Sequence, residues 1–117
     1  MSSKHLFIEQ WTPRPAWIAR TPAERRAFAD AVLGAIEAMK AGGIRTLGWG
    51  VADRGVDHAD PAVSFWAVWE MDSAEAVAGF CQGVEASGWY TLFEQRNTTG
   101  VAQTPAQVLE LLAGIPS

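Results

Sequence analysis

The sequence is short of cysteine, histidine and basic residues, and each shortage excludes a kind of structure or partner. Cys81 is the only cysteine in 117 residues, so the chain can form no internal disulfide. Nine lysine and arginine residues stand against thirteen acidic ones, which gives a net charge of −4, and no basic cluster is longer than Arg25-Arg26. Because nucleic acids and anionic membranes are bound through clustered positive charge, we expect neither as a partner.

Long apolar runs are missing as well. No segment approaches the roughly 18 apolar residues that a membrane-spanning helix needs. The opening segment, MSSKHLFIEQW, has too short an apolar stretch for a secretion signal, and Glu9 interrupts it. We therefore expect a cytoplasmic protein.

Apolar and aromatic residues are what the chain has in quantity. Hydrophobic residues make up 49% of the sequence and charged residues 19%, a balance typical of a folded protein rather than a disordered one. Six of the residues are tryptophan. A chain of 117 residues is long enough for one core and too short for two, so we expect a single domain over residues 1–117.

Helix-start signals alternate with strand-like segments along the chain. TPAE at 21–24 and TPAQ at 104–107 each combine a threonine N-cap, a proline at the first helical position and a glutamate or glutamine at the third. The segment 72–75 reads as another capping box, with Asp72 as the cap. The expected strands cover residues 4–12, 44–52, 62–71 and 89–97, and the expected helices begin near residues 21, 72 and 104.

The order of these elements is β-α-β-β-α-β, followed by a short C-terminal helix. With right-handed crossovers, this order gives a ferredoxin-like α+β fold. Its four-stranded antiparallel sheet has the order 4-1-3-2, and both crossover helices lie on one face. The chain then leaves the opposite face of the sheet, here called the open face, without a cover.

Large apolar residues occur at both parities of the expected strands, so both faces of the sheet need a cover. We assign to the helices the set Leu6, Ile8, Phe65, Ala67, Trp69, Met71, Thr91 and Phe93. We assign to the open face the set Phe7, Glu9, Trp11, Trp66, Val68, Glu70, Tyr90, Leu92, Glu94 and Arg96. A patch with several large aromatics exceeds what a monomer normally exposes. We therefore expect a homodimer whose two open faces enclose a barrel-like space.

Four segments carry a resemblance to known proteins: PAWIARTPAER (15–25), GWG (48–50), FWAVWE (65–70) and SGWYTLFEQRN (87–97). The pattern resembles the dimeric α+β barrel superfamily, which includes cofactor-free monooxygenases of antibiotic biosynthesis, haem-degrading enzymes and chlorite-dismutase-like proteins. More closely, it is similar to a small uncharacterised bacterial family whose layout is close to that of darcynin-type domains. The resemblance implies the fold and a dimer, and it implies no particular reaction.

Glutamates among apolar neighbours on the assigned open face are the candidate acid–base groups. Such surroundings raise the pKa of a carboxyl group, which suits proton transfer near neutral pH. If the protein is an enzyme, we expect Glu70 or Glu94 to be the base and Arg96 to hold an anionic group, and we expect these three to meet His5. The resemblance implies a cofactor-independent oxygenase, isomerase or lyase. The residues expected to bind a small apolar or aromatic ligand are His5, Glu9, Trp11, Trp49, Trp66 and Tyr90.

The alternative is a non-catalytic dimeric module, for binding or for structure, in which the glutamates only complete ion pairs or reach solvent. A cavity beside Glu70 or Glu94 would favour the enzyme, and a space filled with side chains would favour the module. Trp89 is a further candidate for a pocket wall. Gln10, Gln95 and Asn97 would either bind a ligand or satisfy loop backbone.

Neither a metal nor a cofactor is expected. The acidic residues and the histidine of the loop 53–61 have no recognised ligand spacing, and no nucleotide-binding motif occurs. Cys81 lies on the apolar stripe of a helix and is expected to be an unreactive core thiol. Gly48 and Gly50 share one face of a strand, which predicts a close approach by another backbone, a helix or a ligand.

Overall fold

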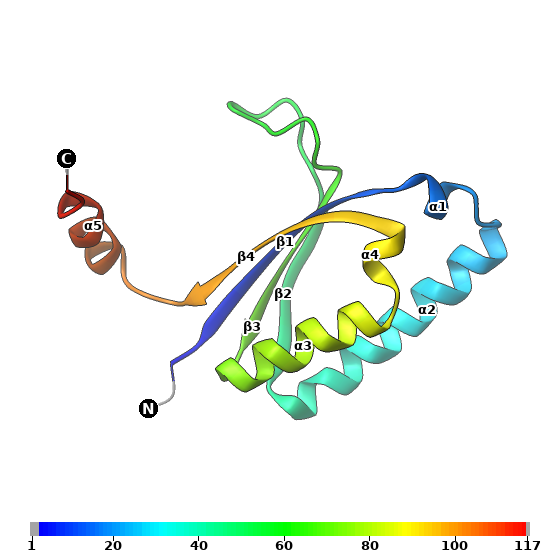
Figure 1. Ribbon diagram of the computed structural model, residues 1–117, viewed down its shortest axis with the longest axis horizontal. Helices are drawn as coiled ribbons and strands as arrows, with labels where there is room; N and C mark the ends of the chain where they lie inside the picture. Colours follow the sequence, from blue (N-terminus) through cyan, green and yellow to red (C-terminus); the bar gives the residue numbers. More distant parts are fainter. Residues whose placement is uncertain (1–2, 117) are drawn as a thin grey trace.

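The computed structural model describes residues 3–116. Within this range, four strands form one antiparallel sheet in the order β2-β3-β1-β4 (Figure 1). The strands are β1 (His5–Pro13), β2 (Ile44–Val51), β3 (Phe65–Met71) and β4 (Phe93–Val101). The predicted ferredoxin-like α+β fold and its strand order are confirmed.

The two long helices lie side by side on the same face of the sheet (Figure 1). They are α2 (Pro22–Met39), which is followed by the short 3-10 helix η1 (Lys40–Gly42), and α3 (Ala74–Ala86). The shorter helices are α1 (Pro15–Ile18), α4 (Trp89–Leu92) and α5 (Pro105–Ala113). None of the helices within residues 3–116 is long and apolar enough to cross a membrane.

The helix starts follow the capping residues closely. The hydroxyl of Thr21 accepts from the backbone N–H of Glu24, and the Glu24 carboxylate accepts from the N–H of Thr21 at 2.8 Å, so the predicted capping box is confirmed. The prediction for α3 is wrong by one residue. Ser73 caps this helix, because the carboxylate of Asp72 instead binds Lys4 and Arg45.

The expected strand 89–97 starts too early. Gly88 has a φ of +82°, and its carbonyl accepts from the N–H of Thr91 at 3.0 Å, which turns residues 89–92 into the helix α4. Tyr90, Thr91 and Leu92 therefore do not belong to a strand, and our assignment of them to sheet faces was wrong. The strand β4 begins only at Phe93 and continues to Val101.

The strand register shows that the two faces of β1 are exchanged relative to our prediction. Phe7 lies opposite Trp69, and Glu9 lies opposite Ala67, so these two β1 residues share the helix-covered face with β3 residues that are almost fully buried. Phe7 is only 2% exposed, whereas its neighbour Ile8 is 40% exposed on the open face. The assignment for β1 failed because both of its parities are apolar, and a shift of one residue exchanges the two faces.

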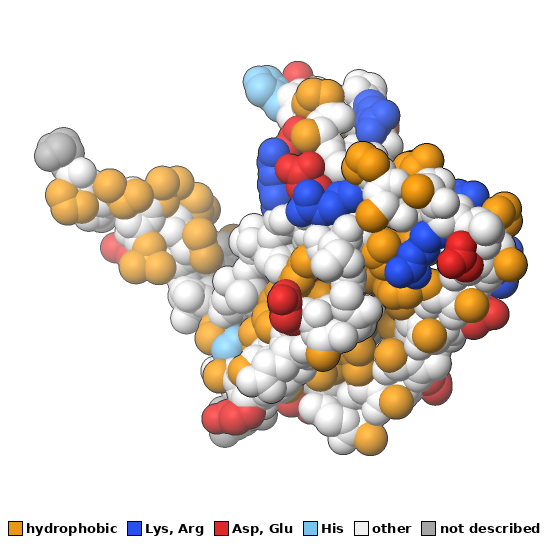
Figure 2. Space-filling model, turned by 45° about the vertical axis from the view of Figure 1, so that its right-hand side comes forward, with side chains coloured by type: hydrophobic (Ala, Val, Ile, Leu, Met, Phe, Trp, Pro, Cys, Tyr) orange, Lys and Arg blue, Asp and Glu red, His pale blue; other side chains and the backbone are white. Residues whose placement is uncertain are grey.

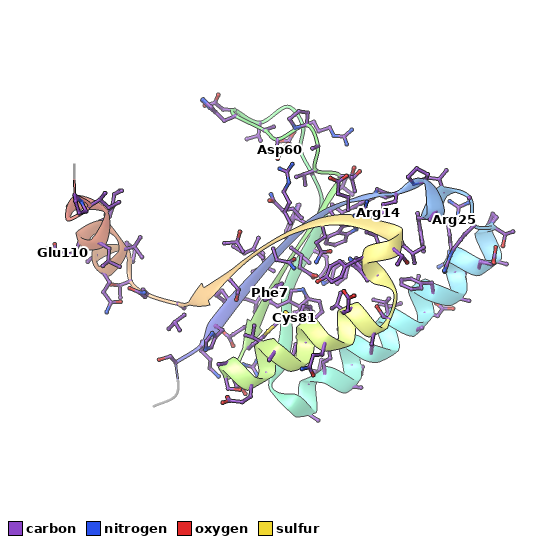
Figure 3. All side chains as sticks on the ribbon, viewed as in Figure 1. Phe7, Arg14, Arg25, Asp60, Cys81 and Glu110 are labelled. Carbon is purple, nitrogen blue, oxygen red and sulfur yellow. The ribbon has the colours of Figure 1, made fainter. Side chains whose placement is uncertain are left out.

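The assignment for β3 is confirmed. Ala67, Trp69 and Met71 are buried beneath the helices, whereas Trp66 lies on the open face and is 36% exposed. The aromatic core on the covered face includes Phe7 against Phe80, with ring centres 5.1 Å apart. Figure 3 shows the side chain of Phe7 in the layer between the sheet and α3.

The two glycines of β2 make room for an indole rather than for a ligand or another backbone. A Cβ on Gly50 would come within 2.5 Å of the Trp66 ring, and one on Gly48 would lie 3.6 Å from it. Trp66 thus covers β2 on the open face. The predicted close approach exists, but a side chain of the neighbouring strand makes it.

Candidate functional site

A carboxyl group is buried at the centre of the helix-covered face. Glu9 lies in the middle of β1 and is 4% exposed. The indole Nε1 of Trp69 donates to its Oε1 at 2.6 Å, and the amide Nε2 of Gln95 donates to its Oε2 at 2.7 Å. Both oxygens are thus held by neutral donors from the strands on either side, which offsets part of the cost of burial.

Burial raises the pKa of Glu9 above its ordinary value of 4.5, and the hydrogen bonds from Trp69 and Gln95 oppose this rise only in part. Among residues 3–116, no lysine, arginine or histidine forms an ion pair with Glu9. Glu9 therefore binds a proton at higher pH than an exposed glutamate does. A carboxyl group of this kind suits the donation or acceptance of a proton near neutral pH.

A chain of hydrogen bonds fixes the orientation of Gln95. Its Oε1 accepts from the indole of Trp89 at 2.6 Å, and its Nε2 also donates to Asn97 at 2.8 Å. Asn97 in turn donates to the hydroxyl of Tyr90 at 3.3 Å. Polar groups therefore run from the buried Glu9 along the covered side of β4 towards α4, so the expected ligand or backbone role of Gln95 gives way to a role in positioning Glu9.

Two adjoining cavities lie between α2 and the sheet. The smaller has a volume of about 90 Å³ and is lined by Glu9 together with residues of α2, α3 and the sheet. The larger has a volume of about 530 Å³, and its lining side chains are aliphatic or aromatic apart from Thr46. The residues that line both cavities are Val32, Ile36, Trp49 and Trp89. The two spaces thus make one apolar slot with the carboxyl group at its inner end.

Aromatic rings from the sheet and from α1, α2 and α4 form much of the wall of the slot. Trp89 packs on Phe93 with ring centres 4.2 Å apart, and Trp17 packs on Phe28 with ring centres 5.5 Å apart. Trp11 is buried behind this wall and contacts both Trp49 and Trp89. Such a surface fits a flat apolar molecule better than a charged one.

Of the residues predicted to bind a ligand, Glu9, Trp49 and the additional candidate Trp89 line the slot, and Trp11 supports its wall. Trp66 lies on the open face instead. His5 lies half-buried at the start of β1, opposite Met71. Tyr90 reaches the site only through Asn97, and burial raises the pKa of its hydroxyl.

The expected meeting of charged groups on the open face does not occur. Leu6 pairs with Glu70 and Thr12 pairs with Glu94, so the two glutamates lie about 20 Å apart along β1. Glu70 forms an ion pair with Arg45 at 2.8 Å, while Glu94 is exposed. The prediction that Glu9 shares the face of these two glutamates is also wrong. A catalytic role for Glu70 or Glu94 stays a prediction.

Arg96 binds Asp60, in the loop between β2 and β3, at 2.5 Å rather than a glutamate. The thiol of Cys81 is half-buried in α3, and burial together with the nearby charge of Glu9 raises its pKa. Figure 3 shows Cys81 on the sheet side of this helix. Residues 3–116 hold no group of three or more histidine, cysteine, aspartate or glutamate side chains placed to bind a metal ion.

Sequence reasoning missed Trp17 and did not connect Gln95 with Glu9. Trp17 stands in the proline-rich segment between the expected strand 4–12 and the expected helix start at residue 21, and α1 places its ring centre 4.9 Å from that of Phe93. Gln95 follows Phe93 by two positions on β4. Because side chains alternate between the two faces of a strand, Gln95 lies on the same helix-covered face as Phe93. The signal for Gln95 was present in this alternation, but the correct face of β1 was needed to find its partner Glu9.

Known structures share this fold. A mutant of chlorite dismutase from Candidatus Nitrospira defluvii has a TM-score of 0.71 and 13% identity over 100% of this chain and 51% of its own. The same enzyme in complex with imidazole has a TM-score of 0.71 and 16% identity over 98% of this chain and 44% of its own. This chain therefore spans about half the length of those proteins, and at such identities the likeness shows the fold alone.

Shorter proteins match over nearly their whole length. A dimeric protein of unknown function with a ferredoxin-like fold from Bacteroides fragilis has a TM-score of 0.51 and 16% identity, covering 85% of this chain and 96% of its own. A dimeric ferredoxin-like protein of unknown function from Thermobifida fusca has a TM-score of 0.52 and 14% identity, covering 87% of this chain and 93% of its own.

No curated protein sequence matches the chain. A family does match, over residues 4–115, and its description gives no function. This bears out the expected resemblance to an uncharacterised family, while the finer likeness to darcynin-type domains stays a prediction. The chain belongs to the Family of unknown function DUF6616.

Proposed function

We propose that the protein binds a small, uncharged and mostly apolar molecule in the slot between α2 and the sheet, and that Glu9 exchanges a proton with it. The observation that carries this proposal is the buried Glu9 carboxyl at the inner end of an apolar slot, held by neutral donors. The larger cavity, at about 530 Å³, falls within the usual range for small-molecule sites.

The chemistry follows from the protonation state of Glu9. In its ionised form, the carboxylate accepts a proton from an acidic C–H or O–H bond of the ligand and becomes the neutral acid. It can then return that proton to another atom of the ligand, which restores the carboxylate and needs no further reactant. Proton abstraction is also the opening step of the cofactor-independent oxygenase and lyase reactions that the sequence resemblance implies.

Fluorescence titration with 2-acetonaphthone, a neutral aromatic ketone, tests the site. Val32 lines both cavities, so Val32→Trp fills the slot and is expected to weaken binding at least tenfold. Leu47→Trp, which adds the same ring at an exposed residue of β2, is the matched control and should leave binding unchanged. Equal affinity in the wild type and in Val32→Trp would contradict the proposed site.

The pH dependence of the same titration tests the role of Glu9. Its protonated form donates to the ketone oxygen, so affinity is expected to fall as the pH rises through the raised pKa of Glu9. Glu9→Gln keeps a neutral donor at this position and should bind the ketone with no such pH dependence. An unchanged pH profile in this variant would remove Glu9 from the mechanism.

One observation favours the non-catalytic alternative. Both oxygens of Glu9 are already hydrogen-bonded within the protein, as they would be if the residue only linked β1 to β3 and β4. Native mass spectrometry of protein from its own host separates the two functions. A bound small molecule that is absent from Val32→Trp supports the binding site, whereas an empty wild-type protein favours a structural module.

We also propose that the chain forms a homodimer through its open face. The support is the apolar surface there, which its own helices leave uncovered, and the two neighbours of the same fold that are described as dimeric. The apolar residues on this face are Leu6, Ile8, Trp66 and Val68. Sedimentation equilibrium is expected to give twice the chain mass, and Ile8→Asp is expected to shift the protein towards the monomer.

A further inference from the structure

The C-terminal arm, residues 102–116, carries the well-formed helix α5, which packs on no other element within residues 3–101. Thr104 caps α5 in a reciprocal capping box with Gln107. Every residue from 101 to 116 is nevertheless exposed. The large aliphatic side chains of the arm are 51–65% exposed: Val108, Leu109, Leu111, Leu112 and Ile115.

Figure 1 shows α5 standing beyond the end of β4, with the sheet between it and the helices α2 and α3. In Figure 2, hydrophobic atoms gather over this separate arm. A nine-residue helix is shorter than the roughly 12–15 residues at which isolated helices become marginally stable in water, so its stability depends on packing. The apolar surface of α5 therefore needs a cover from outside the body of its own chain.

A membrane surface is a poor candidate for that cover. Amphipathic helices that lie on anionic membranes use lysine and arginine on their polar side. Residues 97–117 contain neither, and Glu110 is the single charged residue among them. Figure 3 shows Glu110 on this arm, apart from every other labelled residue.

We infer that α5 packs on the open face of a second copy of the chain, so that the two copies exchange their arms. This inference rests on the proposed dimer. Each copy then supplies one uncovered apolar helix and one uncovered apolar sheet face, and a two-fold pair satisfies both surfaces twice. The N–H of Ala102 donates to the carbonyl of Lys4, so the arm leaves its own chain at the end of the sheet. From there it can extend to a second copy.

Photo-cross-linking in the full-length chain tests the exchange. The variant Leu111→p-benzoylphenylalanine is made in ¹⁴N and ¹⁵N forms, which are unfolded together, refolded and irradiated. About half of the cross-linked pairs are expected to carry both isotopes, with the link in peptides of β1 or β3. Links within one isotope only would place the arm on its own chain, and links to α2, or none, would also overturn the inference.

A second variant separates failure of the arm from failure of the dimer. Leu109→Glu/Leu112→Glu is expected to weaken the dimer at least tenfold, whereas Ala27→Glu/Ala31→Glu adds the same charge to exposed positions of α2 as the control. A wild-type monomer would end both proposals. A dimer of unchanged affinity in Leu109→Glu/Leu112→Glu would end the inference about the arm alone, as would binding of the wild type to phosphatidylcholine or phosphatidylglycerol vesicles.

Discussion

The two faces of one sheet treat their acidic residues in opposite ways. On the helix-covered face, Glu9 is buried among indoles and its pKa is raised. At the edge of the open face, Asp72 binds Lys4 and Arg45 at 2.6 Å, and these hydrogen bonds hold its pKa well below the ordinary value of 3.8. The difference shows how surroundings set the pKa of a carboxyl group: burial without a cationic partner raises that of Glu9, whereas hydrogen bonds from Arg45 and Lys4 lower that of Asp72.

The largest expected effect is on the free energy of unfolding, and it separates Phe7 from its neighbour Ile8, which lies on the opposite face. Phe7→Ala opens a cavity in the core and is expected to lower the free energy of unfolding by about 3–5 kcal/mol. Ile8→Ala, on the half-exposed side, should cost the isolated chain less than about 1.5 kcal/mol. Urea unfolding at two protein concentrations measures both and separates any effect on a dimer. A greater loss for Ile8→Ala would mean that β1 faces the other way.

A smaller effect is expected at the glycines of β2. Gly50→Ala places a methyl group within 2.5 Å of the Trp66 ring, and the repacking of the open face should cost about 1–3 kcal/mol. Gly48→Ala is the matched control, because its methyl group would make only ordinary contact at 3.6 Å. Equal stabilities of the two variants in thermal unfolding would show that Trp66 does not rest on Gly50.

The smallest effects are expected in the pH dependence of stability, and they differ in sign between the two acids. The folded state binds the proton of Glu9 more tightly than the unfolded state does, so stability falls as the pH rises above 4.5 towards the raised pKa. Asp72 contributes stability above 3.8 that is lost as the pH falls towards its lowered pKa.

Urea unfolding from pH 2.5 to 8 compares the two acids directly. Glu9→Gln should remove the loss of stability at rising pH, and Asp72→Asn should remove the loss at falling pH. If both variants changed the same limb of the profile, the contrast between the two faces would be wrong.

Local signals were enough to predict the fold. The capping residues at Thr21 and Thr104 are properties of short segments, and the topology follows from the order of the elements. The four residues of α4 were missed because their composition is typical of a strand. The positive φ of Gly88, which a sequence does not show, decides their conformation.

The candidate site was predicted only in part, because it depends on register. Glu9 and Trp49, two of the predicted ligand-binding residues, line the slot, but Glu9 was placed on the open face because the other parity of β1 looked more apolar. Its burial is made tolerable by the donors of Trp69 and Gln95, which come from residues 60 and 86 positions away along the chain. No local pattern reports contacts of that range, and one residue of slip exchanges the faces.

The most direct test is a titration of the Glu9 side chain itself. In ¹³C NMR of glutamate-labelled protein, the carboxyl signal that disappears in Glu9→Gln belongs to this residue, and its chemical shift is followed from pH 3 to 9. We expect its midpoint to lie above 4.5, and a midpoint at or below that value would contradict a dry, proton-holding site on the covered face.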